Sequence, residues 1–312
     1  MKVSVVLATY NGSKFIEEQM KSINSQTIKA DEVYISDDCS TDNTVLIAKK
    51  FINENKLDGK WKINVNQKNK GYAKNFLDAS IKSVGDVIFF CDQDDIWFEN
   101  RIEIMVNILK KHEDINLLCS NVEFFYQDVN LIKKGKKELN DGTLEKLEFN
   151  TLNFHLRRPG CAMCIRKDFL IKIMPWWIER WAHDDFVWKM AIISNSCAVV
   201  NNCLLKRRKY PNSVTARAVK TYNREKRIHL LNDWKKQYEV LKRYVLEEYK
   251  TIKGIEIIDK NIRAIDIRKT IVEKRYVWRW FIICCKYRDC YPRIKGMYLD
   301  LYLALFNKYK NI

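Results

Sequence analysis

Apolar runs and amphipathic stretches alternate over the first hundred residues of the chain. Short β-branched and apolar runs between turn residues predict strands. The predicted strands are Val3–Tyr10, Glu32–Ser36, Ile63–Val65 and Val87–Cys91. The stretches between them carry apolar side chains at near-helical spacing and predict helices at Ser13–Ser25, Thr44–Asn55 and Ala73–Ser83. This alternation is typical of a doubly wound α/β fold with a mostly parallel sheet flanked by helices.

Polar residues at the starts of the first two predicted helices are suited to capping. Ser13 is expected to cap the first helix, and Ser40, Thr41 and Asp42 supply capping chemistry for the second.

The pattern changes beyond about residue 215. Apolar residues recur at helical spacing among charged ones over Val219–Lys250, and Ile255–Tyr276 looks similar, so both predict amphipathic helices. The end of the chain, including Val277–Lys286 and Tyr298–Phe306, mixes aromatic and aliphatic residues with Lys and Arg. No stretch reaches the ~20 apolar residues that span a bilayer. We therefore expect a helical C-terminal region over residues 216–312.

This helical region has two open interpretations. Basic residues beside Trp, Tyr and Phe suit an anionic membrane surface. Most amphipathic helices instead pack on their own domain or on a partner. The sequence allows either a peripheral membrane contact or a homodimer through these helices.

Three carboxylates, Asp92, Asp94 and Asp95, directly follow the apolar run Val87–Cys91. Carboxylates this close repel one another unless a cation joins them. Ligands bind at the carboxyl ends of strands in an open parallel sheet, and Mg²⁺ is typically held there by one or two carboxylates and the phosphates of a substrate. For this segment alone, a solvated acidic turn that caps a helix starting near Glu99 is an equal alternative.

A second predicted strand also ends in acids, at Asp37 and Asp38, and the two acidic ends would meet on one edge of the sheet. Four motifs now stand in order. They are Val5–Gly12, Ser36–Asp42, Asn69–Gly71 with Asn75, and Asp92–Asp95. In this order and spacing the chain resembles glycosyltransferase family 2, over about residues 1–215.

The resemblance implies a GT-A type, Rossmann-like fold, with a nucleotide-sugar-binding half at residues 1–100 and an acceptor-binding half at 101–215. It implies an inverting transferase that uses a nucleotide-activated sugar and Mg²⁺ or Mn²⁺. The Asp-Gln-Asp-Asp-x-Trp form of the metal motif and a later His-Asp pair resemble the bacterial branch that builds surface polysaccharides, including rhamnosyltransferases. That branch usually has two aromatic residues after His-Asp, whereas this chain has Asp185 and Phe186, which leaves the sugar undetermined.

The resemblance assigns each motif residue an expected role. Asp94 and Asp92 would ligate the metal, and Asp38 would accept a hydrogen bond from a uracil or thymine ring, because an ionised carboxylate only accepts. Asp184 would be the general base, with Asp185 as its alternate. The residues expected at the nucleotide sugar are Thr9, Tyr10, Asn11, Asp38, Lys70, Asn75, Asp92, Gln93 and Arg207. Those expected at the acceptor are Trp97, Gly160, Cys161 and His183.

Two of these assignments have ordinary alternatives. Gly160, in the segment Arg157–Lys167, is expected where the backbone approaches a sugar closely, but glycine is also common in plain turns. The pair Asp184 and Asp185 at a helix start would by itself be read as N-terminal capping acids, with His183 as a packing residue.

One departure from the family pattern concerns the metal. Family members often carry a further His ligand where this chain has the run Lys206–Ala216, which contains none. Either metal binding is then weaker, or Arg207, Arg208 and Lys209 clamp the diphosphate directly, unless this run is simply a solvated basic face.

Composition agrees with an enzyme that handles anions. Lys and Arg number 56 against 39 Asp and Glu, which gives a net charge of +17 and favours anionic partners. The ten cysteines lack regular metal-site spacing and suggest reduced thiols in a cytoplasmic protein, and the N-terminus leads directly into a strand rather than a signal peptide.

We therefore expect an inverting transferase that moves a sugar from a UDP- or dTDP-type donor to a lipid-linked or core oligosaccharide at the cytoplasmic membrane surface. A nucleic-acid-binding protein is the rival from another class, but the basic residues are spread along the chain without a recognised motif. A nucleotide-sugar-binding scaffold without catalysis is the third possibility. No nucleic-acid partner is expected.

Overall fold

The computed structural model describes residues 1–126, 138–210, 223–249, 254–291 and 293–306. The chain divides into two compact units. The sheet unit comprises Met1–Glu148 and Leu156–Lys209, and the helical unit comprises Phe149–His155 and Tyr210–Ile312. The boundary expected near residue 215 lies outside the described residues. No pattern in the sequence indicates that residues 149–155 belong with the helices.

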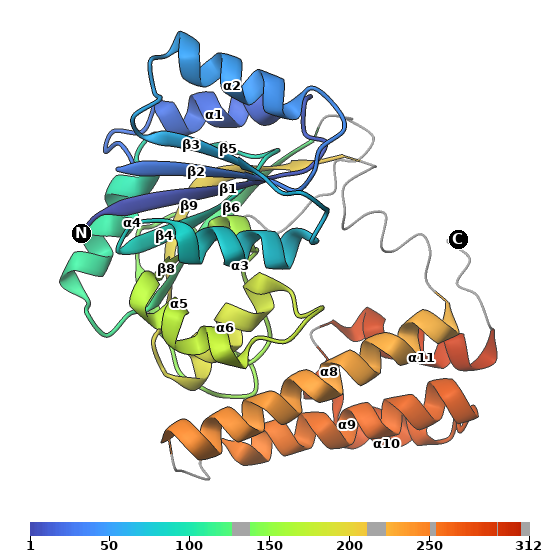
Figure 1. Ribbon diagram of the computed structural model, residues 1–312. Helices are drawn as coiled ribbons and strands as arrows, with labels where there is room; N and C mark the ends of the chain where they lie inside the picture. The colour runs from blue at the N-terminus through green and yellow to red at the C-terminus, as the bar shows by residue number, and fades with distance from the viewer. Residues whose placement is uncertain (127–137, 211–222, 250–253, 292, 307–312) are drawn as a thin grey trace. The chain divides into compact units, whose positions relative to one another are not determined.

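One mixed sheet forms the centre of the sheet unit (Figure 1). Its strands are β1 (Val3–Thr9), β2 (Glu32–Asp37), β3 (Trp61–Val65), β4 (Val87–Asp92), β5 (Ile96–Trp97), β6 (Leu117–Tyr126), β7 (Leu144–Leu147), β8 (Met163–Arg166) and β9 (Cys197–Lys209). They follow the order β3-β2-β1-β4-β8-β6-β9-β5, with β7 paired to β9.

The direction of the strands differs between the two halves of this sheet. β1, β2, β3 and β4 are parallel, as predicted. β8 runs antiparallel to both β4 and β6, and β5 and β7 run antiparallel to β9. Parallel neighbours need a long crossover that is usually helical, and residues 138–159 contain no helix before β8. The parallel arrangement therefore holds for the first half, and the second half is mixed.

Helices cover both faces of the sheet (Figure 1). They are α1 (Ile16–Asn24), α2 (Thr44–Glu54), α3 (Tyr72–Lys82), α4 (Arg101–Lys111), α5 (Lys167–Ile173) and α6 (His183–Ile193). Apolar residues of α1, α2 and α4 pack with alternate residues of β1 and β4 in one core. On the opposite face, Phe76 of α3 packs against Phe90 of β4, with ring centroids 5.7 Å apart. The register places Thr9 beside Asp37 and Ala8 beside Asp92, so the acidic strand ends share one edge.

The start of α1 differs from the expectation, and that of α2 agrees only in part, because its N-cap is Asn43 without a side-chain cap and only Asp42 of the three predicted residues contacts its first N–H. α1 begins after Phe15 and has no side-chain cap. The backbone N–H of Ser13 instead donates to Oδ2 of Asp42 at 3.1 Å. Oδ1 of Asp42 accepts the N–H of Thr44 at 3.0 Å, at the start of α2. Asp42 therefore ties the loop after β1 to α2.

The helical unit is built from helices that pack around a small core. They are α8 (Arg224–Tyr244), which continues into a π-helical turn at Val245–Tyr249, α9 (Ile255–Lys274), α10 (Arg279–Lys286) and α11 (Ile294–Leu305). Asn223 caps α8 by accepting the N–H of Lys226 at 2.8 Å. Within the described ranges, no helix combines the length and the apolar character needed to cross a membrane.

Asp300 of α11 joins three elements of this unit. Its side chain is fully buried. Oδ1 accepts from Nε of Arg227 at 2.5 Å, and Oδ2 accepts from Nε of Arg268 at 2.8 Å and from the Tyr291 hydroxyl at 2.7 Å. Burial raises the pKa of Asp300, but the nearby Arg268 and Arg227 outweigh it and hold the pKa below its usual value.

Asp300→Asn is expected to destabilise the helical unit by about 3–5 kcal/mol, because it leaves buried guanidinium groups without their counter-charge. In the unmodified protein the lowered pKa means that this stabilisation is present above about pH 4 and is lost as the pH falls further. Denaturant unfolding followed by circular dichroism at neutral and acidic pH measures both effects. Asp266→Asn, which removes the exposed pair with Lys235, is the control and should cost less than about 1 kcal/mol. Equal stability of the two variants would contradict this role.

Candidate active site

A cluster of acids lies where β4 ends. The oxygens of Asp92 and Asp95 and the sulfur of Cys161 all lie within 4.8 Å of one another. Asp95 is only 2% exposed. Its Oδ1 accepts the backbone N–H of Arg208 at 3.1 Å, and its Oδ2 is buried without a hydrogen-bond partner among the described residues. Two close carboxylates, one with an unused oxygen, form a donor set that fits Mg²⁺ or Mn²⁺.

The electrostatics of this cluster also favour a bound cation. Burial raises the pKa values of Asp92 and Asp95, and repulsion within the acidic loop raises them further, with Asp94 acting on both. Arg207 opposes this effect on both groups. A divalent cation would relieve the same repulsion. The set that the structure brings together is Asp92 with Asp95, whereas the sequence favoured Asp92 with Asp94. Asp94 lies in the same loop, and its metal role stays a prediction.

Neighbouring arginines of β9 have different surroundings. Arg207 lies among the acids, which raise its pKa although burial alone would lower it. Arg208 donates from Nε to the backbone oxygen of Asp94 at 2.9 Å and pairs with Glu18. Its guanidinium lies 4.4 Å from the ring centroid of Phe125. Successive side chains of a strand point to opposite faces, so of these two only Arg207 is placed to meet an anion at the acidic cluster.

The third member of the predicted clamp, Lys209, lies with its Nζ 4.7 Å from the ring centroid of Phe124. Residues 211–216 of that run lie outside the described residues.

Gln93 connects the loops that follow β1 and β4. Its Oε1 accepts the N–H of Tyr10 at 2.9 Å, and its Nε2 donates to the backbone oxygen of Tyr10 at 3.0 Å. A Cβ at Gly12 would lie only 2.1 Å from Oε1 of Gln93, so this approach requires glycine. Next to it, Asn11 has a φ of 48° and accepts the N–H of Thr41 at 2.8 Å. Gln93 and Asn11 therefore shape the predicted nucleotide loop through backbone contacts.

The acids that end β2 have separate partners. Asp37 accepts from the hydroxyl of Thr9 at 2.7 Å and from the backbone and hydroxyl of Ser40. Asp38 accepts the backbone N–H groups of Lys70 at 2.9 Å and Gly71 at 2.8 Å. Asp37 and Thr9 thus stabilise the loop, and Asp38 fixes the turn before α3.

Asn75, by contrast, is buried behind this turn. Its Oδ1 accepts from Ser36 and Asn66, at 2.7 and 2.8 Å, and its Nδ2 donates to the backbone oxygen of Ser36. Asn66 also donates to Asp38 at 3.0 Å. The amide of Asn75 is used within the protein, so it supports the Asp38 turn instead of the direct nucleotide contact that the sequence suggested. The ammonium of Lys70 is likewise engaged, with Asp78 at 3.1 Å.

The first turn of α6 brings a further carboxylate to the acidic cluster. Asp184 is near enough for its charge to raise the pKa of Asp92. Partial burial and the charges of Asp184, Asp185 and Asp92 raise the pKa of Tyr72 to about 12. Asp185 has its own partners, because its Oδ2 accepts from Nε1 of Trp181 at 2.8 Å. The same oxygen pairs with the buried Nζ of Lys189 at 2.6 Å, which gives Asp185 a structural role.

The position of His183 differs from its predicted place at the acceptor. The ring is 4% exposed and stacks on Phe76 with centroids 4.2 Å apart, while Phe90 meets it edge-on at 5.2 Å. Burial lowers its pKa, so the imidazole is neutral at pH 7. Both ring nitrogens lack hydrogen-bond partners among the described residues. His183 therefore packs α6 against the sheet and is not exposed to an acceptor.

Gly160 also has a different neighbour from the one expected. A Cβ there would lie 2.6 Å from Nε2 of His183 and 3.2 Å from Cβ of Asp184. The close approach that requires glycine is therefore that of α6, not that of a sugar.

Gly160→Ala is expected to cost about 1–3 kcal/mol of stability, because His183 is confined by aromatic rings and cannot move aside. It should also displace Asp184 and lower the rate of any reaction that depends on it. Thermal unfolding and turnover measurements test both effects. Gly59→Ala, where an added Cβ meets nothing within 4 Å, should be nearly neutral. Unchanged stability and turnover in Gly160→Ala would contradict this packing.

Trp97 and Cys161 are core residues, although the sequence placed them at the acceptor. Trp97 is 3% exposed, and the guanidinium of Arg101 lies 4.0 Å from its ring centroid. Arg101 is itself buried and donates from Nη2 to the backbone oxygen of Cys161 at 2.6 Å. Cys161 is fully buried beside Asp95. The sequence carried no signal for Arg101, because a lone Arg in an amphipathic helix usually faces solvent.

The sequence matches the model of glycosyl transferase family 2 over residues 4–172. The chain belongs to this family. The family resemblance inferred from the motifs is thus confirmed, and the chain has the expected GT-A type fold.

Relatives in sequence agree with this family, and solved structures agree with this fold. The chain is 35% identical over 205 residues to the dTDP-rhamnosyl transferase RfbG of Shigella flexneri, an alignment that covers 64% of this chain and 61% of that protein. It is 33% identical over 124 residues to the putative glycosyltransferase EpsE of Bacillus subtilis, covering 40% and 44%. The chain thus spans less than two thirds of the length of these relatives.

Among solved structures, S. aureus TarS 1-349 in complex with UDP-GlcNAc superposes with a TM-score of 0.64 at 19% identity, covering 98% of this chain and 80% of that one. The mannosyltransferase PcManGT from Pyrobaculum calidifontis, in complex with GDP-Man and Mn²⁺, gives a TM-score of 0.57 at 14% identity, covering 97% and 86%. At these identities the likeness concerns the fold.

Proposed function

We propose that this protein is an inverting, metal-dependent glycosyltransferase of bacterial surface polysaccharide synthesis. It moves a sugar from a nucleoside diphosphate donor to a hydroxyl group of a lipid-linked or core oligosaccharide, in O-antigen, capsule or lipooligosaccharide. One observation carries the proposal. At the carboxyl end of β4, Asp92 and Asp95 lie together, Arg207 lies within electrostatic reach of both, and Asp184 lies within reach of Asp92. A place for a diphosphate thus adjoins a carboxylate that can take a proton.

The donor is proposed to be a UDP- or dTDP-sugar. Asp38 lies at the end of β2 and is only 2% exposed, and its carboxylate already accepts from Asn66 and from the two donors of the Lys70–Gly71 turn, which leaves about one acceptor position. A carboxylate has about four acceptor positions, so it can accept the imide N–H of uracil or thymine as well. The names of the relatives support this class, since RfbG is a dTDP-rhamnosyl transferase and WfgD of Escherichia coli uses UDP-Glc.

The leaving diphosphate is proposed to lie between Arg207 and the Asp92 and Asp95 pair. When bound there, Mg²⁺ or Mn²⁺ supplies stabilisation of the negative charge that develops on the departing nucleoside diphosphate. Arg207 adds a fixed positive charge on the protein side. The Mn²⁺ in the PcManGT structure supports this class of metal.

Asp184 is proposed as the general base. Its carboxylate takes the proton of the acceptor hydroxyl while that oxygen attacks the anomeric carbon, and the bond from this carbon to the diphosphate oxygen breaks. Attack opposite the leaving group inverts the anomeric centre. Asp185 is less suited to this task, because Trp181 and Lys189 already hold its carboxylate.

The lipid-linked acceptor and the location at the membrane are also proposals. WfgD is described as acting on a diphosphoundecaprenol-linked sugar, which supports a lipid-linked acceptor. Such an acceptor would place the enzyme at the cytoplasmic face of the membrane. No role in nucleic-acid binding is proposed.

Calorimetric titration of the protein with UDP, TDP, GDP and CDP, each with and without Mn²⁺, tests the proposal. We expect UDP or TDP to bind, and binding to strengthen with Mn²⁺. Asp92→Asn should lose the metal effect, and Asp58→Asn, at an exposed acid of the same unit, should keep it. Binding of UDP or TDP that is indifferent to Mn²⁺ would contradict the metal assignment and support Arg207 as the main diphosphate contact. The absence of binding to all four nucleotides would contradict the donor class.

A further inference from the structure

The outer face of α10 and α11 is apolar and aromatic, which is unusual for helices on the surface of a small unit. In α10, Trp278 at the start is 58% exposed and Phe281 is 67% exposed, whereas only Ile283 is buried. In α11, Tyr298 and Leu305 are each 55% exposed. An amphipathic helix normally turns its apolar stripe to the core, so these side chains form a second, outward stripe.

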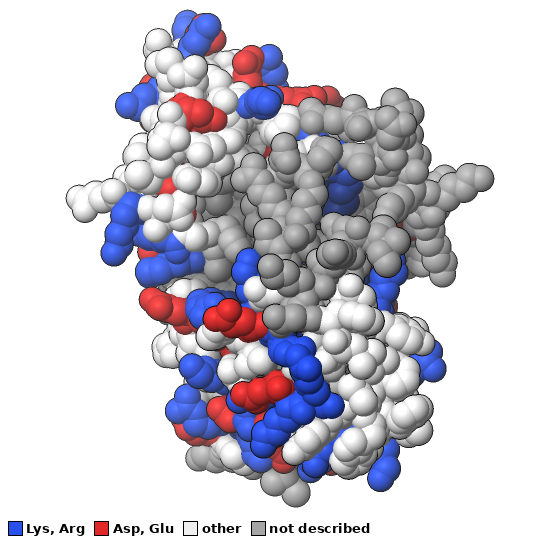
Figure 2. Space-filling model, turned by 90° about the vertical axis from the view of Figure 1, so that its right-hand side faces the viewer, with Lys and Arg blue, Asp and Glu red and all other residues white. Residues whose placement is uncertain are grey.

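This stripe is continuous across the two helices. The ring of Trp280 lies 5.8 Å from that of Phe281 and 5.6 Å from that of Tyr298. Nε1 of Trp280 donates to the backbone oxygen of Met297 at 3.1 Å, which fixes α10 against α11. We call the surface made of the exposed Trp278, Phe281, Tyr298 and Leu305, with the partly buried Trp280 that packs on the core beneath them, the aromatic face. Figure 2 shows uncharged side chains over much of one side of the helical unit, beside a row of Lys and Arg.

The sequence that carries the aromatic face is strongly basic. From Lys274 to Lys295 the sequence has seven Lys and Arg against one acid, Asp289. That acid pairs with Lys260 at 2.6 Å, outside this segment. Asp300, the next acid along the chain, is buried between two arginines. The segment that carries α10 and the start of α11 is therefore positive on balance.

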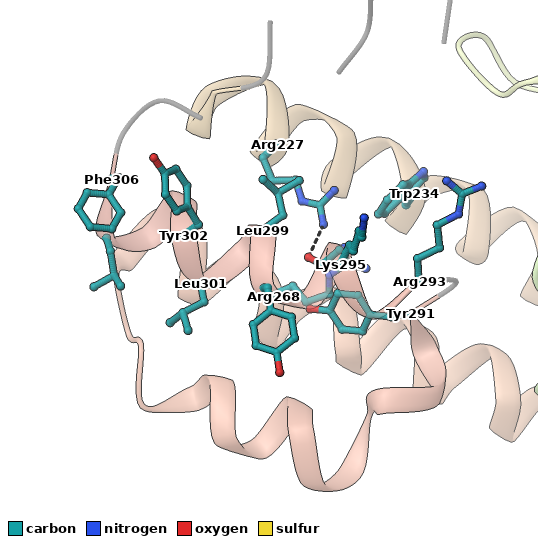
Figure 3. Close-up of a pocket in the computed structure, with 13 residues that line it drawn as sticks. Arg227, Trp234, Arg268, Tyr291, Arg293, Lys295, Leu299, Leu301, Tyr302 and Phe306 are labelled. Atoms are coloured by element: carbon teal, nitrogen blue, oxygen red, sulfur yellow. Dashed lines mark hydrogen bonds between the residues drawn. The ribbon is translucent and has the colours of Figure 1, made fainter. Parts of the chain in front are cut away.

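A cavity of about 840 Å³ opens between α8, α9 and α11. Its wall includes Tyr298, Leu301, Tyr302 and Phe306, and Arg293 and Lys295 also line it (Figure 3). An apolar wall with basic side chains matches an amphiphile that carries a negative head group.

We propose that the helical unit docks on an anionic lipid bilayer through the aromatic face of α10 and α11. Amphipathic rings that enter the headgroup region, with Lys and Arg around them, are the pattern that such a surface requires. A second copy of this chain is a poorer occupant, because two identical basic surfaces would repel each other across a twofold axis. The inference concerns the helical unit alone and does not depend on the reaction.

Flotation of the full-length protein with vesicles tests the proposal. We expect binding to vesicles of equal parts phosphatidylcholine and phosphatidylglycerol, and little binding to phosphatidylcholine alone. Trp278→Ser combined with Phe281→Ser should weaken binding at least about tenfold, since two apolar anchors are lost. Lys286→Glu combined with Arg288→Glu should weaken it at least about twentyfold, since each basic residue near the surface contributes roughly fivefold.

Matched controls lie on the sheet unit. Leu46→Ser changes an exposed apolar residue, and Lys49→Glu combined with Lys82→Glu changes the net charge by the same amount as the Lys286 and Arg288 pair. Both should retain binding, and circular dichroism verifies that all variants fold. Equal losses in the two charge-reversed proteins would overturn the proposal, because binding would then follow net charge only.

Three other results would also overturn it. The first is the absence of vesicle binding by the unmodified protein. The second is a homodimer, detected by analytical ultracentrifugation, that the Trp278 and Phe281 changes dissociate without any effect on vesicle binding. The third is salt-sensitive binding of RNA or DNA that these changes abolish while vesicle binding persists. Because no donor is present in these assays, nucleotide binding and vesicle binding can fail independently.

Discussion

Asp184→Asn is expected to lower kcat by about 10²–10⁴-fold while the affinity for the nucleotide stays unchanged, because a general base acts on the acceptor and not on the donor. The amide keeps the size of the side chain and its contact with the N–H of Asp185, which Oδ1 of Asp184 accepts at 2.9 Å. The loss would therefore reflect the missing proton acceptor and not a rearranged helix. Transfer of radiolabelled sugar and calorimetry with the nucleotide give the two quantities.

Asp185→Asn is the matched control for this prediction. The change should lower stability, since it weakens the pair with the buried Lys189. Its effect on kcat should be much smaller than that of Asp184→Asn. If Asp184→Asn kept full activity and Asp185→Asn lost it, the base would be Asp185, and the structural role assigned to Asp185 would be wrong.

Asp92→Asn is expected to abolish metal-dependent transfer, with a loss of at least about a thousandfold, because the metal contributes several kcal/mol to the stabilisation of the leaving diphosphate. The same change should stabilise the metal-free protein. Burial and the neighbouring acids raise the pKa of Asp92, so its ionised form at pH 7 is unfavourable in the folded state, and removing the charge removes that cost.

Thermal unfolding with and without Mn²⁺ separates these effects. Mn²⁺ should raise the Tm of the unmodified protein, since a ligand that binds the folded state stabilises it. Asp92→Asn should show a higher Tm without metal and little response to Mn²⁺. Asp58→Asn, which changes an exposed acid, should behave as the unmodified protein. A lower Tm for metal-free Asp92→Asn would show that the acids at β4 are not in mutual repulsion.

The alternating pattern of residues 1–100 was sufficient to predict the parallel half of the sheet. Strands with continuous apolar runs, separated by amphipathic helices, leave few alternatives. β1, β2 and β4 lie where the sequence placed them, within one or two residues. The second half was harder, because β7 and β8 are short and no α-helix separates them, so their direction depends on which strands they join.

The predicted site residues also fall into two groups, those that the motifs indicated and those whose burial the sequence did not reveal. The motifs singled out Asp92, Asp94 and Asp184, because these acids stand next to recognisable strand or helix ends, and their roles stay predictions. The motifs did not show which neighbours would be buried. His183, Trp97 and Cys161 were expected at an acceptor, yet each belongs to the core. Adjacent positions in a motif point in different directions, and only packing decides which of them face a ligand.

The sequence by itself therefore determined the family, the parallel nucleotide half, the acidic edge of the sheet and the helical C-terminal region. These depend on periodicity and on motifs that are local in the chain. The tertiary structure alone decided that Asp95 joins Asp92 beside Cys161, that Arg207 and not Arg208 faces the acids, and that Gly160 makes room for His183. Each of these depends on contacts between segments far apart in sequence, and no local pattern encodes the distance between two such side chains.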